Sequence, residues 1–237
     1  MKHKAVLFAA IFLAGSLAFA AQETKTLSLE AEGITQFEIN CEAGFLKVQG
    51  VEGLKTIEVK AEIHAGGVDE KGMKKFIEDH IKLILENKEG RAVLVSEVKG
   101  DLFSSFSDVR IDLTVSCPKQ MGLNVEDGSG GIEVRSIAGN LDIEDGSGAI
   151  QVENVQGDLE INDGSGEIEI KDITGNVSIE DGSGSLTVLN VGGNLTIDDG
   201  SGSIDVDGVG KDLILKDTGS GSVNSRNVKG RVIEDED

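Results

Sequence analysis

The sequence is poor in the residues that most often build catalytic and metal-binding sites. Among 237 residues there are three histidines, two cysteines, one proline and no tryptophan or tyrosine. His64 and His80 are too few and too scattered to form a metal or catalytic set. Basic residues are also scarce, because 22 Lys and Arg face 43 Asp and Glu and give a formal net charge of −21. This charge disfavours nucleic acid and anionic lipid as partners and favours cations, cationic surfaces or simple solubility.

A tetrapeptide repeat dominates the second half of the chain. Asp-Gly-Ser-Gly begins at residues 127, 145, 163, 181 and 199, always 18 residues apart, and a sixth copy at 217–221 contains an inserted Thr. Aliphatic residues recur with the same period in five columns, which begin at Ile132, Val134, Ile137, Leu141 and Ile143. Within each unit they alternate with polar residues, which is typical of a strand with one buried face.

These columns predict an all-β fold, a parallel β-solenoid (β-helix) with coils of about 18 residues. One unit cannot bury its own apolar face, so the core must run through a stack of equivalent units. Each coil should contain two short strands and two tight corners, and six coils at about 4.8 Å each would extend about 29 Å. We expect the regular solenoid over 126–232 and a solvated acidic tail over 233–237.

Residues 1–20 have the pattern of a secretory signal peptide. Lys2 and Lys4 precede an apolar stretch, and Ala18-Phe19-Ala20 carries small residues at the positions that matter for cleavage. We expect cleavage after Ala20 and export to the periplasm, the cell surface or the extracellular space. No later segment is apolar enough to cross a bilayer, so we expect no membrane insertion after cleavage.

Residues 21–125 have a weaker form of the same pattern and should be continuous with the solenoid. Segments such as Phe37–Ile39, Phe45–Val48 and Ile57–Val59 indicate one or two degenerate coils. An insertion at about 64–107 breaks the pattern, with a short helix over 69–80 capped by Asp69 and then a strand pair. We expect this insertion to cover an otherwise open end of the solenoid.

The arrangement resembles the bacterial "putative adhesin" family, a domain of unknown function. The resemblance rests on Val115-Ser-Cys117-Pro118-Lys119, on the strand Leu123-Asn-Val125, and on the repeated Gly-x-Ile-x-Val and Gly-Asn-Leu-x-Ile segments. It covers roughly residues 27–232 and implies exported β-solenoid repeat proteins. The family has no established catalytic residues to carry over.

Two interpretations of the Asp of each repeat remain open. An Asp at the start of a turn can accept a hydrogen bond from the backbone N–H two residues on. Stacked carboxylates about 5 Å apart repel each other, however, by about 3 kcal/mol at an effective dielectric of 20, and bound Ca²⁺ would relieve that repulsion. The candidate calcium ligands are the six Asp residues of this position, Asp127, Asp145, Asp163, Asp181, Asp199 and Asp217.

The second corner and the Ser positions favour structural roles. Asn140, Asp158, Asn176, Asn194 and Asp212 recur with the 18-residue period and predict an amide ladder. The repeated Ser residues lie outside any nucleophile-elbow pattern, and no His lies in the repeats to act as a base. The sequence therefore predicts no catalytic residues and no cofactor other than Ca²⁺.

Cys41 and Cys117 each extend an alternating apolar stretch, so both side chains can point inward. In an exported protein the pair can form a disulfide, or the two can remain buried thiols. The sequence does not decide between these states, because it does not place the two Cα atoms within bridging distance.

The leading functional hypothesis is an exported, non-catalytic β-solenoid that acts as an adhesin-like binding module or an envelope scaffold. Its partner would be a surface ligand, either a protein or a glycan. The first alternative is a Ca²⁺-binding repeat module stabilised by the Asp residues. The second is a polysaccharide-acting enzyme, because parallel β-helices can present paired carboxylates beside a sugar groove.

Overall fold

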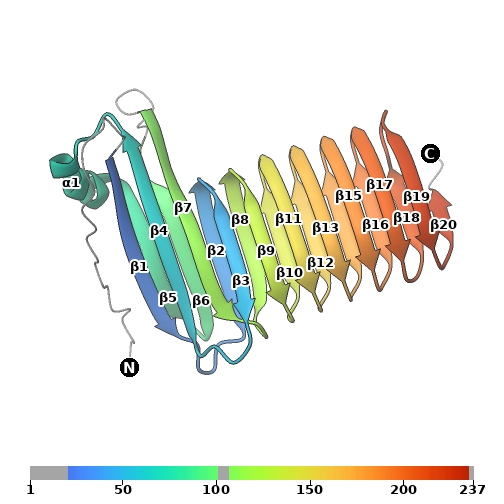
Figure 1. Cartoon of the computed structure of the whole chain (residues 1–237), viewed down its shortest axis with the longest axis horizontal. Helices are drawn as coiled ribbons and strands as arrows, with labels where there is room; N and C mark the ends of the chain where they lie inside the picture. Colours follow the sequence, from blue (N-terminus) through green and yellow to red (C-terminus); the bar gives the residue numbers. More distant parts are fainter. Residues whose placement is uncertain (1–20, 101–106, 235–237) are drawn as a thin grey trace.

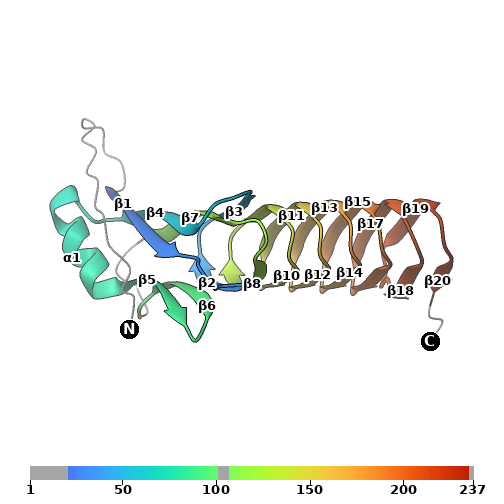
Figure 2. The same cartoon turned by 90° about the horizontal axis from the view of Figure 1, so that it is seen from below.

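Two long β-sheets face each other and enclose one apolar core (Figures 1 and 2). The computed structural model describes residues 21–100 and 107–234. The predicted signal peptide at 1–20 and the end of the acidic tail lie outside these ranges. Within the described residues, no helix has the length and apolar character needed to span a membrane.

Each sheet has ten strands. Sheet A has, in spatial order, β1 (Ala21–Glu30), β4 (Thr56–Gly66), β7 (Ser107–Pro118), β3 (Leu46–Val51), β9 (Ile132–Ile137), β11 (Gly148–Val155), β13 (Gly166–Ile173), β15 (Gly184–Val191), β17 (Gly202–Val209) and β19 (Ser222–Val228). Sheet B has β20 (Val232–Glu234), β18 (Leu213–Asp217), β16 (Leu195–Asp199), β14 (Val177–Asp181), β12 (Leu159–Asp163), β10 (Leu141–Asp145), β8 (Gly122–Ser129), β2 (Gln36–Ala43), β6 (Arg91–Val98) and β5 (Ile81–Lys88).

From β8 onward the chain forms the predicted parallel β-solenoid. Each coil runs up sheet B and down sheet A, and equivalent strands pair in parallel with an offset of 18 residues, as in Ile150 with Ile168 or Leu141 with Leu159. The five aliphatic columns therefore stack on themselves, and their members are almost fully buried through the regular coils. The prediction of an all-β solenoid with 18-residue coils is confirmed.

The N-terminal region is less regular than the sequence indicated. β2 and β3 form one degenerate coil, but this coil lies between the pair β6 and β7 and the pair β8 and β9. The prediction that Ile57–Val59 belongs to a further coil is wrong. This segment lies in β4, which runs antiparallel to both β1 and β7, because the turn after β3 reverses the chain direction.

The insertion after β4 forms the predicted helix and strand pair. α1 (Glu70–His80) begins at Asp69, whose Oδ1 accepts a hydrogen bond from the Gly72 N–H at 2.8 Å. Met73 and Phe76 are buried, and α1 packs against β1 and β5, the edge strands of the two sheets. Figure 1 shows the helix at the end of the stack opposite the C-terminus, where it covers the sheet edges as expected.

The C-terminal end of the stack is polar rather than covered by a helix. β19 and β20 continue the register, but Ser225 pairs with Val206 and Glu234 pairs with Leu215. Two aliphatic columns thus end in polar residues, and both of these side chains are exposed. A polar outer face is what a terminal repeat needs to remain soluble.

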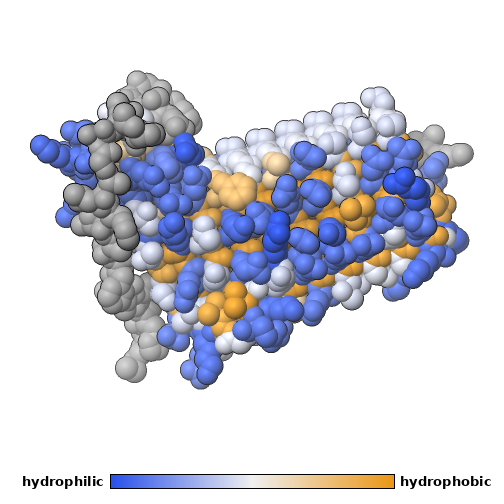
Figure 3. Space-filling model, in the orientation of Figure 1, coloured by the Kyte–Doolittle hydropathy of each residue, from blue (hydrophilic) through white to orange (hydrophobic). Residues whose placement is uncertain are grey.

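Glycine is required where the corner between sheet B and sheet A brings successive coils into backbone contact. At Gly148, φ is +143° and an added Cβ would lie 1.5 Å from the carbonyl oxygen of Gly130. The same approach recurs one coil later, where a Cβ on Gly166 would lie 1.6 Å from the Gly148 oxygen. The row of pale residues along the upper edge of the solenoid in Figure 3 follows this Gly-Ser-Gly corner.

We therefore predict that Gly148→Ala destabilises the protein by about 2–3 kcal/mol, because the new methyl group must displace the backbone of the neighbouring coil. The measurement is the free energy of unfolding from urea titration. Ser147→Ala, one residue away on the same corner, is the matched control and should change stability by less than about 0.5 kcal/mol. Equal effects of the two substitutions would contradict the close-approach argument.

Candidate functional site

The repeat Asp residues lie on the inner face of sheet B. In β10 the residues Leu141, Ile143 and Asp145 share one face, and all three are buried. Five Asp side chains, called the Asp column below, are buried in this way: Asp127, Asp145, Asp163, Asp181 and Asp199. Their inward direction follows from the period of two in a strand, since each Asp comes two residues after an aliphatic residue.

Each carboxylate of the Asp column accepts hydrogen bonds from its own turn. The Ser147 N–H donates to Asp145 Oδ1 at 3.2 Å, and the Ser183 N–H donates to Asp181 Oδ1 at 3.0 Å. The same bond recurs at 163 and 199. The predicted bond to the N–H two residues on is therefore present, and it closes the turn within one coil.

Asp217 does not belong to the Asp column, although the repeat spacing placed it there. The pairing of β16 with β18 shifts by one residue after Ile197, so that Asp217 pairs with Asp198. Its side chain is exposed, and its Oδ1 accepts from the Gly219 N–H at 2.8 Å. The sixth copy of the repeat contains one extra residue, and the Asp217 carboxylate lies outside the Asp column.

Burial raises the pKa of every member of the Asp column. Desolvation is the largest cause in each case, and the hydrogen bonds from the turn N–H groups act against it. Repulsion from a neighbouring Asp adds to the increase, so that the pKa values of Asp145 and Asp181 rise to about 6. The pKa values of the column therefore lie above those of exposed carboxylates.

The second corner links successive coils instead of closing turns. Asn140 Oδ1 accepts from the Asp158 N–H at 3.1 Å, and Asp158 Oδ1 accepts from the Asn176 N–H at 2.7 Å. Asn176 and Asn194 continue the series to the next coil in each case. The predicted ladder is confirmed, and it holds each coil to the one before it.

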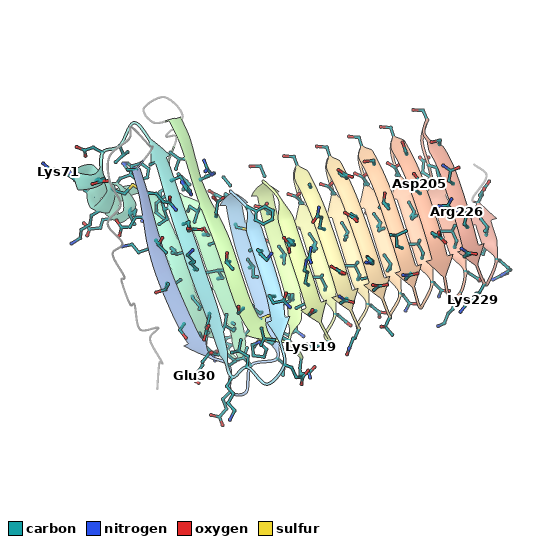
Figure 4. All side chains as sticks on the ribbon, in the orientation of Figure 1. Glu30, Lys71, Lys119, Asp205, Arg226 and Lys229 are labelled. Atoms are coloured by element: carbon teal, nitrogen blue, oxygen red, sulfur yellow. The ribbon has the colours of Figure 1, made fainter. Side chains whose placement is uncertain are left out.

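A groove runs along this second corner on the side of sheet A. It has a volume of about 800 Å³ and crosses the coils from Lys119 to Lys229. Figure 4 shows these two lysines at the same edge of the solenoid and at opposite ends of the regular stack. We call it the corner groove; its lining residues are Lys119, Ser136, Asn154, Val155, Gln156, Asp172, Ile173, Thr174, Asn190, Val191, Gly192, Gly208, Val209, Gly210, Asn227 and Lys229.

One wall of the corner groove is made by residues with left-handed backbone conformation. Asn154 has φ +61°, Asp172 has φ +58° and Asn190 has φ +60°. This conformation turns the chain at each coil and places like side chains side by side, as in the bond of 2.7 Å from Asn190 Nδ2 to Asp172 Oδ1. A smaller groove of about 460 Å³ follows the other side of the corner, along Asn140, Asp158 and their equivalents.

The outer strand faces of the regular coils are acidic, and the two basic residues within 126–210 form ion pairs. Residues 126–210 contain 19 acidic and two basic residues, so most of the negative charge lies on the solenoid. Both basic residues contact Glu153 across the strands, Arg135 at 3.2 Å and Lys171 at 3.7 Å. At the C-terminal end Arg226 pairs with Asp207 and Arg231 with Asp212.

The two cysteines are free thiols in the structure. Cys41 lies in β2, where it pairs with Asp127 of β8 and so continues the Asp column into the degenerate coil. Cys117 is buried in β7 of sheet A. Burial raises the pKa of both thiols, that of Cys117 to about 12, and at Cys41 the hydrogen bond to Asp127 adds to this effect.

The described residues contain no group of three or more His, Cys, Asp or Glu arranged to hold a metal ion. In the Asp column one carboxylate oxygen already accepts turn hydrogen bonds, and the other is enclosed by protein. Ca²⁺ takes six to eight oxygen ligands, so these carboxylates would have to turn outward to bind it.

No family model matches the sequence, and no curated protein matches it. Several solved structures are similar. A "putative cell adhesion protein" from Clostridium sporogenes ATCC 15579 has 16% identity and a TM-score of 0.41, covering 90% of this chain and 99% of its own. A "putative adhesin" from Bacteroides fragilis NCTC 9343 has 11% identity and a TM-score of 0.41, covering 90% and 97%.

A third structure, a "putative lipid binding protein" from Parabacteroides distasonis ATCC 8503, has 17% identity and a TM-score of 0.44, covering 89% of this chain and 94% of its own. The adhesin names agree with the family that the sequence resembles. With TM-scores below 0.5, none of these likenesses indicates what this chain binds.

A thermal melt can decide between the two sequence-based interpretations of the repeat Asp residues, turn residue and calcium ligand. From the inward carboxylates we expect Ca²⁺ to raise the melting temperature of residues 21–237 no more than Mg²⁺ at matched ionic strength. The reference is the same protein with chelator. A Ca²⁺-selective rise of many degrees would instead show that the carboxylates turn outward to form a metal ladder.

The state of the cysteines can be read from thiol titration. We predict no reaction of a thiol reagent with the native protein, because both thiolates are disfavoured by burial, and two reactive thiols per chain in denaturant. Absence of reaction in denaturant without reductant would show a disulfide between Cys41 and Cys117.

Proposed function

We propose that this chain is an exported, non-catalytic binding module, adhesin-like in function, that holds an extended ligand in the corner groove. The observation that carries the proposal is the groove itself, which crosses every regular coil from Lys119 to Lys229. The backbone ladder along the corner takes six steps between these residues, or about 29 Å at 4.8 Å per coil. A ligand that fills the groove must therefore be long and repetitive.

The chemistry of the groove suits a neutral glycan chain. Val155, Ile173 and Val191 line the groove but are almost fully buried, so its accessible groups include the exposed amide side chains of Asn154 and Asn190. Amide groups both donate and accept hydrogen bonds, as sugar hydroxyls do. A polyanion is disfavoured because the solenoid around the groove carries 19 acidic and two basic residues over 126–210.

A binding role fits the chain better than catalysis. The carboxylates recur as uniform columns rather than as one isolated pair beside the groove, and the groove itself contains a single acidic residue, Asp172. Glycoside hydrolysis requires two carboxylates on opposite sides of the scissile bond. The signal pattern at residues 1–20 and the adhesin names of the similar structures support an exported location for such a module.

The proposal predicts that Thr174→Phe weakens binding of short neutral oligosaccharides, such as cello- or chito-oligosaccharides, by at least about tenfold. Thr174 is an exposed residue in the middle of the groove, and a phenyl ring there would occupy the ligand path. Affinity is measured by calorimetry or by NMR titration.

Thr187→Phe provides the matched control, because Thr187 lies on β15 but not in the groove. Equal affinities of the two variants and the original protein would contradict the groove as the binding site. Shortened oligosaccharides in the mixture would contradict the non-catalytic role and favour the enzyme alternative. Preferential binding of acidic oligosaccharides would contradict the electrostatic argument.

A further inference from the structure

The Asp column places five carboxylates at the edge of the apolar core. The exposed fraction of these residues ranges from 0% at Asp199 to 8% at Asp127. Buried charges in proteins are usually paired or bound to metal, since removal of a carboxylate from water is strongly unfavourable. The binding function proposed above does not use these residues, so their burial needs an explanation of its own.

One oxygen of every carboxylate in the column lacks a partner. The turn N–H groups donate to Oδ1 at Asp145, Asp163, Asp181 and Asp199, and Asp127 accepts hydrogen bonds from its own turn and from Cys41. Oδ2 of each of the five residues has no hydrogen-bond partner and is closed off from solvent. An unpartnered buried oxygen is a costly group, and one that repeats in five successive coils is a built feature rather than a local defect.

The strand register brings these unpartnered groups next to one another. Asp145 pairs with Asp127 on one side and with Asp163 on the other, and Asp181 pairs with Asp163 and Asp199. Parallel strands lie about 4.8 Å apart, so each carboxylate has a like neighbour within one side-chain length. If all five were ionised, every neighbouring pair would repel in a poorly solvated setting.

Among the described residues, no Lys, Arg or His is a main cause of the pKa shifts in the column. The ionisable side chains that cause them are its own members, Cys41 at the N-terminal end and Asp217 beyond Asp199. The residue before each Asp points to the opposite face of sheet B, and the residue after the Gly-Ser-Gly corner points out from sheet A. The residues that precede the five Asp residues are Glu126, Glu144, Asn162, Glu180 and Asp198. The residues that follow the five Gly-Ser-Gly corners are Gly131, Ala149, Glu167, Ser185 and Ser203. Neither set contains a basic residue.

We propose that the Asp column retains protons at pH values where exposed carboxylates are ionised, and forms a chain of carboxyl–carboxylate hydrogen bonds along the solenoid axis. A protonated Asp donates its O–H to the Oδ2 of the Asp in the next coil, so one proton satisfies two oxygens and removes one charge. The proton comes from solvent, and no other reactant is involved. At the N-terminal end the Cys41 thiol donates to Asp127 and closes the chain with a neutral donor.

The direction of the pKa changes agrees with this arrangement. Burial raises the pKa of all five, and the two that rise to about 6, Asp145 and Asp181, are separated by one coil. If Asp145 and Asp181 are protonated, each lies between two ionised Asp residues of the adjacent coils. Because the folded-state pKa lies above the ordinary value of 3.8, the native protein binds these protons more tightly than the unfolded chain. The resulting stabilisation is complete below pH 3.8 and is lost as pH rises through about 6.

The first measurement is the number of protons released on unfolding, from the pH dependence of the urea midpoint. We expect release of about one to two protons per molecule near pH 6, whereas carboxylates with ordinary pKa values would release almost none. The wild-type protein should therefore be less stable at pH 8 than at pH 5. A midpoint that is constant or rises over this range would overturn the proposal.

The second measurement uses the double variant Asp145→Asn, Asp181→Asn. Asn keeps an oxygen for the Ser N–H and places a permanent N–H donor toward the neighbouring Oδ2, so it reproduces the proposed protonated state. The double variant should be more stable than wild type at pH 8, and its proton release near pH 6 should fall at least about twofold. A variant that is less stable at pH 8 and equally pH-dependent would contradict the hydrogen-bonded chain.

The matched control is Glu144→Gln, Glu180→Gln. Glu144 and Glu180 directly precede Asp145 and Asp181 and are exposed. Their substitution by Gln removes the same charge as the two Asp→Asn substitutions. A strongly acidic protein gains stability on acidification from reduced overall repulsion alone, and the control measures that contribution. If it changes the proton release as much as the Asn variant does, the effect belongs to net charge and the proposal fails. Asp163→Asn alone provides a second test if the double variant does not fold, with the same expected direction.

Discussion

Backbone-to-backbone stacking of successive coils is the constraint on which the rest of the structure depends. Parallel strands can pair coil after coil only if every coil has the same length and the same corners. At the Gly-Ser-Gly corner the chains approach so closely that a Cβ on Gly148 would lie 1.5 Å from the oxygen of Gly130. The fixed period of 18 residues, the glycines and the five aliphatic columns are consequences of this one requirement.

The two corners meet that requirement in different ways. In the Asp column each carboxylate accepts a hydrogen bond from the Ser N–H of the same corner. At the second corner the Asn140 side chain accepts a hydrogen bond from the Asp158 N–H of the next coil, and the equivalent residues repeat this bond toward the C-terminal end. The first corner therefore buries its carboxylates inside the stack, and the second leaves polar groups outside, where they border two grooves. The proposed sites of proton binding and of ligand binding therefore lie at opposite edges of the same solenoid.

The regular coils could be predicted from the sequence because their contacts repeat with the chain. The inward direction of Asp145 could also be predicted, since Leu141, Ile143 and Asp145 alternate on one face, but the sequence interpretation considered the Asp as a turn residue or a calcium ligand and did not place it in the core. The placement of β2 and β3 between the flanking strand pairs was not predictable, because pairings between distant segments leave no periodic signal. The corner groove was missed because Asn154, Thr174 and Gly192 form a surface only after the coils stack, and none of them belongs to a recognisable motif.

A stack of identical coils has no internal reason to stop, so its length must be set at the ends. At the N-terminal end α1 packs against the edge strands β1 and β5. At the other end Ser225 and Glu234 take positions that aliphatic residues hold in the coil below, and Arg226 and Arg231 pair with acidic residues of that coil. A second copy approaching this end would have to bury polar groups, and its acidic solenoid would repel the first. The polar residues at this end of the described stack therefore make stacking of a second copy onto it unfavourable.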